Sequence, residues 1–442
     1  MIQILLCLTL AAMGMMMVSF SAAGIQIAAI LDVNINYINM CMGAYMFVSA
    51  FFAVPANYLN DRHGVHFGVY IGVTLFLIGA WLRIFIDKSI FYALIGSLLG
   101  GSAFCFVNAP AKIAAVWFGA KETGLRTTII TAMVPLGCMV SFFLPSQFIP
   151  QALLKKLSGV DLAAVVLTPG ERLAGQNSVL SLIYTQNYII TAIVLAVFLF
   201  WRKRPPSPPS LTSASAPVEN CCKAVGELLR LRNYVLMVVC FNIVWSVYGT
   251  VGALVSSITA PYGFGPTHNA VFSICFILFG LVGSFTVGRT LDKRKNFRCV
   301  HISLSGLLVV SLILVQVALW TRSPAPVAIA IGTLGISVLP FLPLSFLYGA
   351  QLTYPLGQAM MGGLLLGTSQ AFAVVVLFLV QGFVDVDIWF GLLFLFALVS
   401  CNFMISLCIQ QDLRRDRAES QASDLSEKMM TELKEGRYSG SP

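Results

Sequence analysis

The stretch that decides the fold reads Asn57-Tyr58-Leu59-Asn60-Asp61-Arg62-His63-Gly64, a short polar segment between two long apolar runs. A related stretch, Gly288-Arg289-Thr290-Leu291-Asp292-Lys293-Arg294, lies further along the chain and is again flanked by apolar runs. Each stretch places an aspartate one or two residues after a leucine and follows it with basic residues. A repeat at about half the chain length predicts two similar halves, which is the plan of an alternating-access transporter.

The composition predicts a membrane protein. The 442 residues are 58% hydrophobic and only 10% charged, whereas an average soluble domain has about 25% charged residues. Runs of about 20 apolar residues, long enough to cross a hydrocarbon core about 30 Å thick, recur along the chain. We therefore expect an all-α membrane protein with twelve transmembrane helices in two six-helix halves.

A change in composition at the midpoint divides the chain. The run Pro205-Pro206-Ser207-Pro208-Pro209-Ser210 cannot bury a core. It predicts a cytoplasmic linker over 202–232, between an N-terminal half (1–201) and a C-terminal half (233–410), with a cytoplasmic tail over 411–442. The expected spans are 3–31, 39–57, 67–86, 90–112, 127–149, a sixth that ends at 201, 233–258, 270–290, 299–320, 326–348, 361–384 and 389–410.

The basic residues indicate the orientation of the chain in the membrane. Of the 27 Lys and Arg, 20 fall on one side of the twelve spans and six on the other, while Lys112 lies inside or just below the fourth span. The basic side of membrane proteins faces the cytoplasm. Both termini and the linker are therefore expected in the cytoplasm and the loop 150–184 outside. The net charge of +9 follows from this bias and does not indicate nucleic-acid binding. The expected partners are the bilayer and a small molecule, for a monomer in the plasma membrane.

Enzyme and metal motifs are missing from the sequence. There is no Gly-rich phosphate loop, no G-x-S-x-G elbow and no metal-binding His pair. We expect no catalysis, no cofactor and no metal site. The eleven cysteines are scattered through apolar spans, as buried apolar side chains are. Palmitoylation of Cys221-Cys222 stays open as an alternative for that pair.

The acidic residues favour transport without proton coupling. All 18 can be placed in loops, at span ends or in the tail. A proton-coupled carrier usually needs an ionisable group inside the membrane, where a charge is costly. Facilitated transport down a gradient is therefore expected, with Lys112 as the residue that could contradict it.

The repeated stretches supply candidate gating residues. We expect Asp61 and Asp292 to close the cytoplasmic side, each by capping a neighbouring helix N-terminus or by pairing with arginine, such as Arg62 and Arg294. The alternative is an ordinary loop acid beside a base, worth about 0–1 kcal/mol.

Polar and aromatic side chains within the spans supply candidate substrate contacts. Asn242, Trp245 and Tyr248 lie three residues apart on the seventh span and share one face. Gln370 follows a glycine-rich stretch of the eleventh span, and a buried glutamine needs a partner. The alternatives are contacts between helices for Gln370 and lipid-facing aromatic rings for Trp245 and Tyr248.

Several motifs together resemble the feline leukaemia virus subgroup C receptor-related family of the major facilitator superfamily. They are Pro55-Ala56-x-x-Leu59-x-Asp61-x-x-Gly64, Ala109-Pro110-Ala111-Lys112-Ile113-Ala114-x-Val116-Trp117-Phe118-Gly119, the proline-rich linker, and Leu352-Thr353-Tyr354-Pro355-x-Gly357 followed by Gln370. The resemblance covers residues 17–410. It implies the major facilitator fold and facilitated transport of haem, choline or ethanolamine.

The resemblance also indicates where this chain departs from its choline-handling members. The ammonium-binding glutamine of the eleventh span is matched by Gln370. The tryptophan of the first span falls on Met17, and the glutamine of the fifth span falls on Pro135. The tyrosine of the seventh span falls on Gly249, beside Tyr248.

Two functions from different classes remain open at this point. The leading hypothesis is a facilitative, uniporter-like carrier of a small organic solute, haem or a choline/ethanolamine-type nutrient. Its substrate contacts would be Gln370, Tyr248, Trp245, Asn242 and Met17. The alternative is a membrane receptor or nutrient sensor that retains the transporter fold without transporting.

Overall fold

The computed structural model describes residues 2–108, 110–117, 123–156, 167–201, 221–259, 262–264, 266–417 and 421, and within them the chain forms helices and no strand. The helices of the N-terminal half are α1 (Ile2–Met17), η1 (Ser21–Ala23), α2 (Gly24–Leu31), α3 (Ile35–His63), α4 (Val65–Leu82), η2 (Arg83–Asp87), α5 (Ile90–Val107), α6 (Pro110–Trp117), α7 (Thr123–Phe148), α8 (Gln151–Lys156) and α9 (Pro169–Phe200).

The remaining helices form the second half of the chain. They are α10 (Cys221–Arg230), α11 (Arg232–Thr259), α12 (Pro266–Arg294), α13 (Phe297–Trp320), α14 (Pro324–Val338), α15 (Phe341–Leu352), α16 (Gln358–Val386) and α17 (Ile388–Cys408). Helix α10 lies inside the segment predicted as a linker, whose residues 202–220 are outside the described part of the chain.

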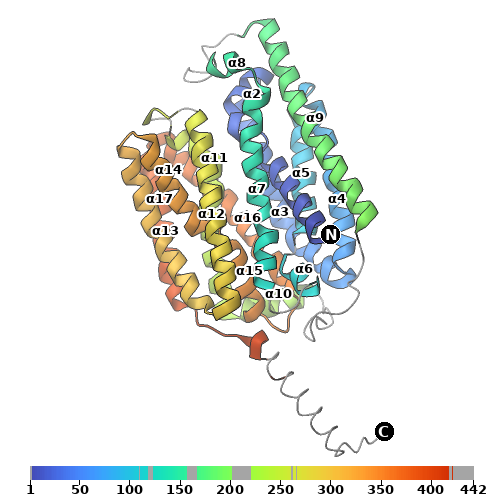
Figure 1. Cartoon of the computed structure of the whole chain (residues 1–442), viewed down its shortest axis with the longest axis vertical. Helices are drawn as coiled ribbons and strands as arrows, with labels where there is room; N and C mark the ends of the chain where they lie inside the picture. The colour runs from blue at the N-terminus through green and yellow to red at the C-terminus, as the bar shows by residue number, and fades with distance from the viewer. Residues whose placement is uncertain are drawn as a thin grey trace, which may run out of the picture.

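The two halves lie side by side as separate bundles (Figure 1). Across the interface α3 packs against α16 and α7 packs against α12. Helices α6 and α10 lie at one end of the molecule and α8 lies at the other (Figure 1). We call the end where α3 and α12 finish and α7 and α16 begin the basic end, and the opposite end the outer end.

Eleven of the described helices are long and apolar enough to cross a membrane, and Ile2–Met17 is a shorter apolar helix. The continuous span expected over 3–31 is wrong, because this segment is divided into α1, η1 and α2. Ser19 lies at the break, where its hydroxyl contacts the carbonyls of Met15 and Met16 at 2.9 and 3.0 Å. Such back-bonding satisfies carbonyls where a helix is interrupted. The three pieces together complete the twelve-helix arrangement.

Helix α9 starts earlier than expected and shortens the outer loop predicted over 150–184. Thr168 and Glu171 form a capping box at its start, with Pro169 in the first turn. Lys156 holds Glu171 from α8 at 2.7 Å. The helix has 32 residues and is about 48 Å long, against about 30 Å for a hydrocarbon core. It therefore extends beyond the bilayer at the outer end.

Small residues let neighbouring helices approach closely in both halves. A β-carbon on Gly96 of α5 would lie 2.6 Å from the Gly79 carbonyl of α4. In the second half, a β-carbon on Gly280 of α12 would lie 2.8 Å from the Gly335 carbonyl of α14. Since a side chain would separate these backbones, glycine sets the helix spacing in both halves.

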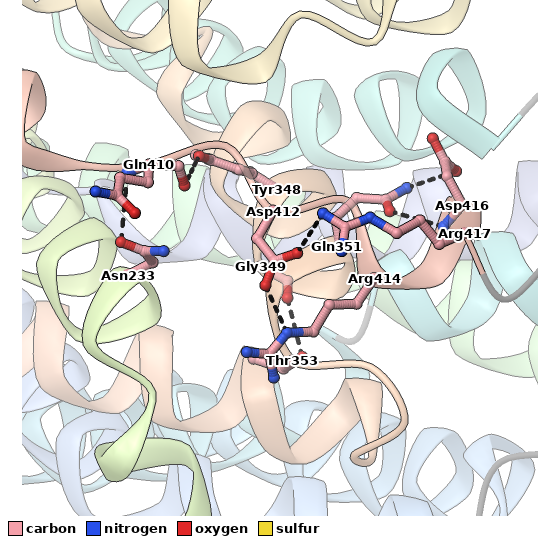
Figure 2. Close-up of polar contacts among 10 residues, drawn as sticks. All are labelled: Asn233, Tyr348, Gly349, Gln351, Thr353, Gln410, Asp412, Arg414, Asp416 and Arg417. Atoms are coloured by element: carbon pink, nitrogen blue, oxygen red, sulfur yellow. Dashed lines mark hydrogen bonds and ion pairs between the residues drawn. The ribbon is translucent and has the colours of Figure 1, made fainter.

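The first residues after α17 dock against the basic end of the second half (Figure 2). The Tyr348 hydroxyl of α15 donates to the Gln410 carbonyl at 3.0 Å. The Gln351 side-chain amide donates to Asp416 Oδ1 at 3.0 Å and accepts from the Asp416 backbone N–H at 3.2 Å (Figure 2). Lys295 pairs with the same carboxylate at 2.9 Å. The tail predicted from residue 411 thus begins as a docked segment.

Candidate functional site

The Asp61 carboxylate joins the two halves at the basic end. It lies at the end of α3, and its side chain is only 2% exposed. Its Oδ2 accepts a hydrogen bond at 2.8 Å from the backbone N–H of Met360, the third residue of α16. Its Oδ1 pairs with the Lys112 ammonium of α6 at 2.5 Å. A carboxylate at a helix N-terminus is stabilised by the helix dipole. We call Asp61, Lys112 and Met360 the first latch.

Asp292 makes the matching contact on the other side of the interface. It lies near the end of α12, and its Oδ2 accepts a hydrogen bond at 2.9 Å from the backbone N–H of Leu125. Leu125 is the third residue of α7, as Met360 is of α16. Each aspartate therefore caps the first turn of a helix in the opposite half. We call Asp292 and Leu125 the second latch.

A close helix crossing lies beside each latch, with one glycine in each pair. Beside the first latch, a β-carbon on Gly363 of α16 would lie 2.7 Å from Cβ of Asn57. Beside the second, a β-carbon on Gly288 of α12 would overlap the Thr128 hydroxyl of α7. Asn57 and Gly288 are equivalent positions of the repeat, and so are Gly363 and Thr128. In the first crossing the glycine lies on the helix that the aspartate caps, and in the second it lies on the helix that carries the aspartate.

The basic residues of the repeat lie away from the carboxylates. Arg62 and Arg294 are exposed, and no described residue forms an ion pair with either of them. The cation that holds Asp61 is Lys112, which also donates to the Asn60 carbonyl at 2.8 Å. Lys112 therefore lies with Asp61 and Asn60 at the basic end.

A cavity lies between the halves, toward the outer end. Residues from both halves line it: Met17, Val18, Met42, Cys138, Phe142, Tyr248, Gly249, Val251, Gly252, Val255, Ser273, Phe276, Ile277 and Ile331. On α11, which starts at the basic end, the lining begins only at Tyr248. On α7, which also starts there, it begins at Cys138. The cavity thus lies beyond the latches, and none of its lining residues is acidic or basic.

Four aromatic rings follow one another along α11 and onto α12. The ring centroids of Trp245 and Tyr248 are 5.0 Å apart, with the rings nearly parallel, and those of Phe241 and Trp245 are 5.7 Å apart. Phe276 lies 6.0 Å from Tyr248. Trp245 and Tyr248 also line a second, smaller cavity with Pro135. The Trp245 indole N–H is buried without an acceptor among the described residues.

The structure brings only part of the predicted substrate set to the central cavity. Met17 and Tyr248 line it from opposite halves, and Trp245 lies beside it. Asn242 instead accepts a hydrogen bond from the Thr368 hydroxyl of α16 at 3.2 Å. Gln370 is 1% exposed and lines neither cavity, and its amide has no partner among the described residues.

The sequence interpretation singles out Gly249 but not Gly252, a second glycine of the cavity wall. Gly249 and Gly252 lie on the wall formed by α11. A β-carbon on Gly252 would meet nothing within 4 Å. Gly252 lies four residues, about one helical turn, after Tyr248, and this spacing is a signal that could have indicated an open face. The described residues contain no group of three or more His, Cys, Asp or Glu that could hold a metal ion.

Comparisons with known proteins agree with this arrangement. A sequence model of the Major Facilitator Superfamily matches residues 4–353. The mouse "Choline/ethanolamine transporter FLVCR1" is 26% identical over 396 residues, which cover 86% of this chain and 69% of that protein. The human "Choline/ethanolamine transporter FLVCR2" is 24% identical over 425 residues, with coverages of 92% and 75%.

Solved structures share the fold at low sequence identity. The transporter FucP in its outward conformation superposes with a TM-score of 0.66 at 16% identity, over 92% of this chain and 98% of that one. The human organic anion transporter MFSD10 gives 0.63 at 12% identity, over 91% and 98%. The predicted fold and the predicted family are confirmed. The chain belongs to the Major Facilitator Superfamily and is a transporter related to FLVCR1 and FLVCR2.

Proposed function

We propose that the protein carries a small organic amine of the choline or ethanolamine class by alternating access, without proton coupling. The observation that carries this proposal is the central cavity between the halves, with both latches closed at the basic end. A site reached from one side while the other is sealed is the arrangement that alternating access requires. The names of the FLVCR1 and FLVCR2 relatives support an amine as the solute.

The chemistry of the cavity is compatible with an organic cation. Tyr248, Phe276 and Met17 are among the residues on its walls. Aromatic faces attract ammonium groups through the ring quadrupole, and thioethers add soft, polarisable contacts. Haem fits less well, because none of the four histidines lines the cavity and histidine is a common axial ligand of haem.

The positions of the charges support facilitated transport. Asp61 and Asp292 lie at helix ends, in contact with backbone donors. Asp32 lies at the C-terminus of α2, where its carboxylate pairs with Arg172, and the Asp387 carboxylate caps the N-terminus of α17. A carboxylate bound at a helix end is poorly placed to carry a proton through the middle of the membrane. The basic end faces the cytoplasm in this proposal, as the bias of the Lys and Arg residues indicates.

Uptake into liposomes tests the proposal. Purified protein should equilibrate labelled choline or ethanolamine across the bilayer, and an imposed pH gradient should leave the rate and the plateau unchanged. Accumulation above equilibrium that a protonophore collapses would contradict the absence of proton coupling. Binding of the amine without any flux would instead support the receptor alternative.

A further inference from the structure

One face of α12 changes from apolar to basic along its length. Val271, Leu278 and Val282 are exposed on this face, with Val282 at 65%. Arg289 and Lys293 continue it, because these five residues follow one another at steps of seven and four. Steps of seven and four keep side chains on one side of a helix. A stripe that faces lipid near the middle of the membrane therefore ends in two cations at the basic end.

A surface groove lies at this transition. The described residues that line it are Val282, Phe285, Thr286, Arg289, Thr290 and Lys293. The hydroxyls of Thr286 and Thr290 donate to carbonyls of their own helix, at 2.8 and 2.7 Å. They therefore present no free donor to the groove. Its chemistry is apolar at the end formed by Val282 and Phe285 and cationic at the end formed by Arg289 and Lys293.

Among the described residues, no anion neutralises the two cations of this groove. Arg289 and Lys293 are exposed, and neither forms an ion pair within the part of the chain that the structure describes. Lys112 and Lys295 at the same end of the molecule, by contrast, are paired with Asp61 and Asp416. Two unpaired cations at membrane-surface depth attract anionic lipid headgroups.

We propose that this groove binds an anionic phospholipid of the leaflet at the basic end. One acyl chain lies along Val282 and Phe285, and the headgroup phosphate lies between Arg289 and Lys293. From Val282 to Lys293 the helix rises about 16 Å, which is the depth of one leaflet. The apolar end favours a lipid over a free phosphate ion, since inorganic phosphate has nothing to place there.

Native mass spectrometry with an equimolar mixture of phosphatidylserine and phosphatidylcholine tests the proposal. The wild-type protein should retain phosphatidylserine preferentially. Arg289→Gln combined with Lys293→Gln should reduce that preference about thirtyfold, since each cation near a membrane surface contributes about fivefold. The matched control is Arg230→Gln with Arg298→Gln, which removes two charges at the same end outside the groove and should leave the preference unchanged.

Two further measurements separate a lipid from a simple anion. Phe285→Ser should lower the retention of phosphatidylserine although the charge is unchanged, and added inorganic phosphate should not displace the lipid. If the double variant folds poorly, the single variants Arg289→Gln and Lys293→Gln should each show the fivefold loss. Equal retention in the groove variants and the control variants would overturn the proposal, and so would displacement by phosphate.

Discussion

Gly357 lies directly against Asp61, so that a β-carbon at position 357 would be 2.6 Å from Oδ2 of that carboxylate. Gly357 is the N-cap of α16, and the Asp61 oxygen occupies the space that a side chain there would fill. The cap of this helix is thus supplied by the opposite half of the protein. Opening the basic end must remove the cap, which makes the contact specific to the closed state.

Gly357→Ala should open the first latch without touching a charge. The added methyl group displaces the carboxylate from the Met360 N–H, and we expect more cysteine labelling at the basic end and slower transport. The matched control is Gly382→Ala on the same helix, where a β-carbon meets nothing within 4 Å. Equal labelling of both variants would show that the contact does not hold the halves together.

Asp61→Ala should destabilise the protein more than loss of a surface ion pair would. It leaves the Lys112 ammonium buried with the Asn60 carbonyl as its one remaining partner among the described residues, and breaking a buried pair costs about 3–5 kcal/mol. Asp61→Ala with Lys112→Met should recover much of the unfolding free energy but not the transport rate. Thermal unfolding and uptake measured on the same samples separate the two effects. A double variant that transports normally would remove the first latch from the mechanism.

The crossing beside the second latch allows a rescue experiment. Gly288→Asn should force α12 away from Thr128 of α7 and impair transport. Adding Thr128→Gly recreates the Asn57 and Gly363 arrangement of the first latch. We expect this pair to restore part of the uptake rate, whereas Thr128→Gly alone should have a small effect. If the second change gives no recovery, the two crossings are not equivalent in packing.

Solute binding in the central cavity should weaken as larger side chains are introduced on the α11 wall. Gly252→Ala should be nearly neutral, because nothing lies within 4 Å of the new atom, whereas Gly252→Phe should fill the cavity and abolish binding. Tyr248→Ala should weaken binding of a cationic solute by about 1–2 kcal/mol through loss of the aromatic face, and Tyr248→Phe should retain most of it. Titration calorimetry with choline checks the order. If the Gly252→Phe variant still binds choline, the binding site lies outside the central cavity.

The variant Gln370→Leu distinguishes two roles of Gln370, which are contact with the solute and packing between helices. The Gln370 amide is buried without a partner among the described residues, so an apolar side chain of similar size should maintain or raise the unfolding free energy. If the amide meets the solute during transport, affinity should fall by about 1–3 kcal/mol. Unchanged affinity together with lower stability would assign Gln370 to helix packing.

Local patterns predicted the parts of the fold that are local or repeated. Apolar runs predicted the spans, and the repeat around Asp61 and Asp292 predicted two carboxylates at helix N-termini. The residues that complete the first latch are distant in sequence, since Lys112 is 51 residues from Asp61 and Met360 is 299. No spacing rule connects them, and adjacency in sequence favours Arg62 instead.

Other features depend on packing that composition does not encode. The interruption after α1 involves Ser19, whose hydroxyl contacts the Gln186 side chain of α9 at 3.0 Å. The docked segment depends on Gln351 matching Asp416, two polar residues that both look solvated in sequence. The depth of Gln370 in the span predicts a substrate contact, but depth alone does not determine which side of a helix meets the cavity.

The overhang of α9 provides a fixed reference point for watching the halves move. Gly170 lies in its first turn, and Gly382 lies near the outer end of α16 in the other half. A β-carbon at either position meets nothing within 4 Å, so cysteine and a spin label can be introduced there without disturbing a neighbour. The distance between the two spin labels would report the opening and closing of the outer end. It should shorten as the outer end closes and lengthen again when the latches re-form.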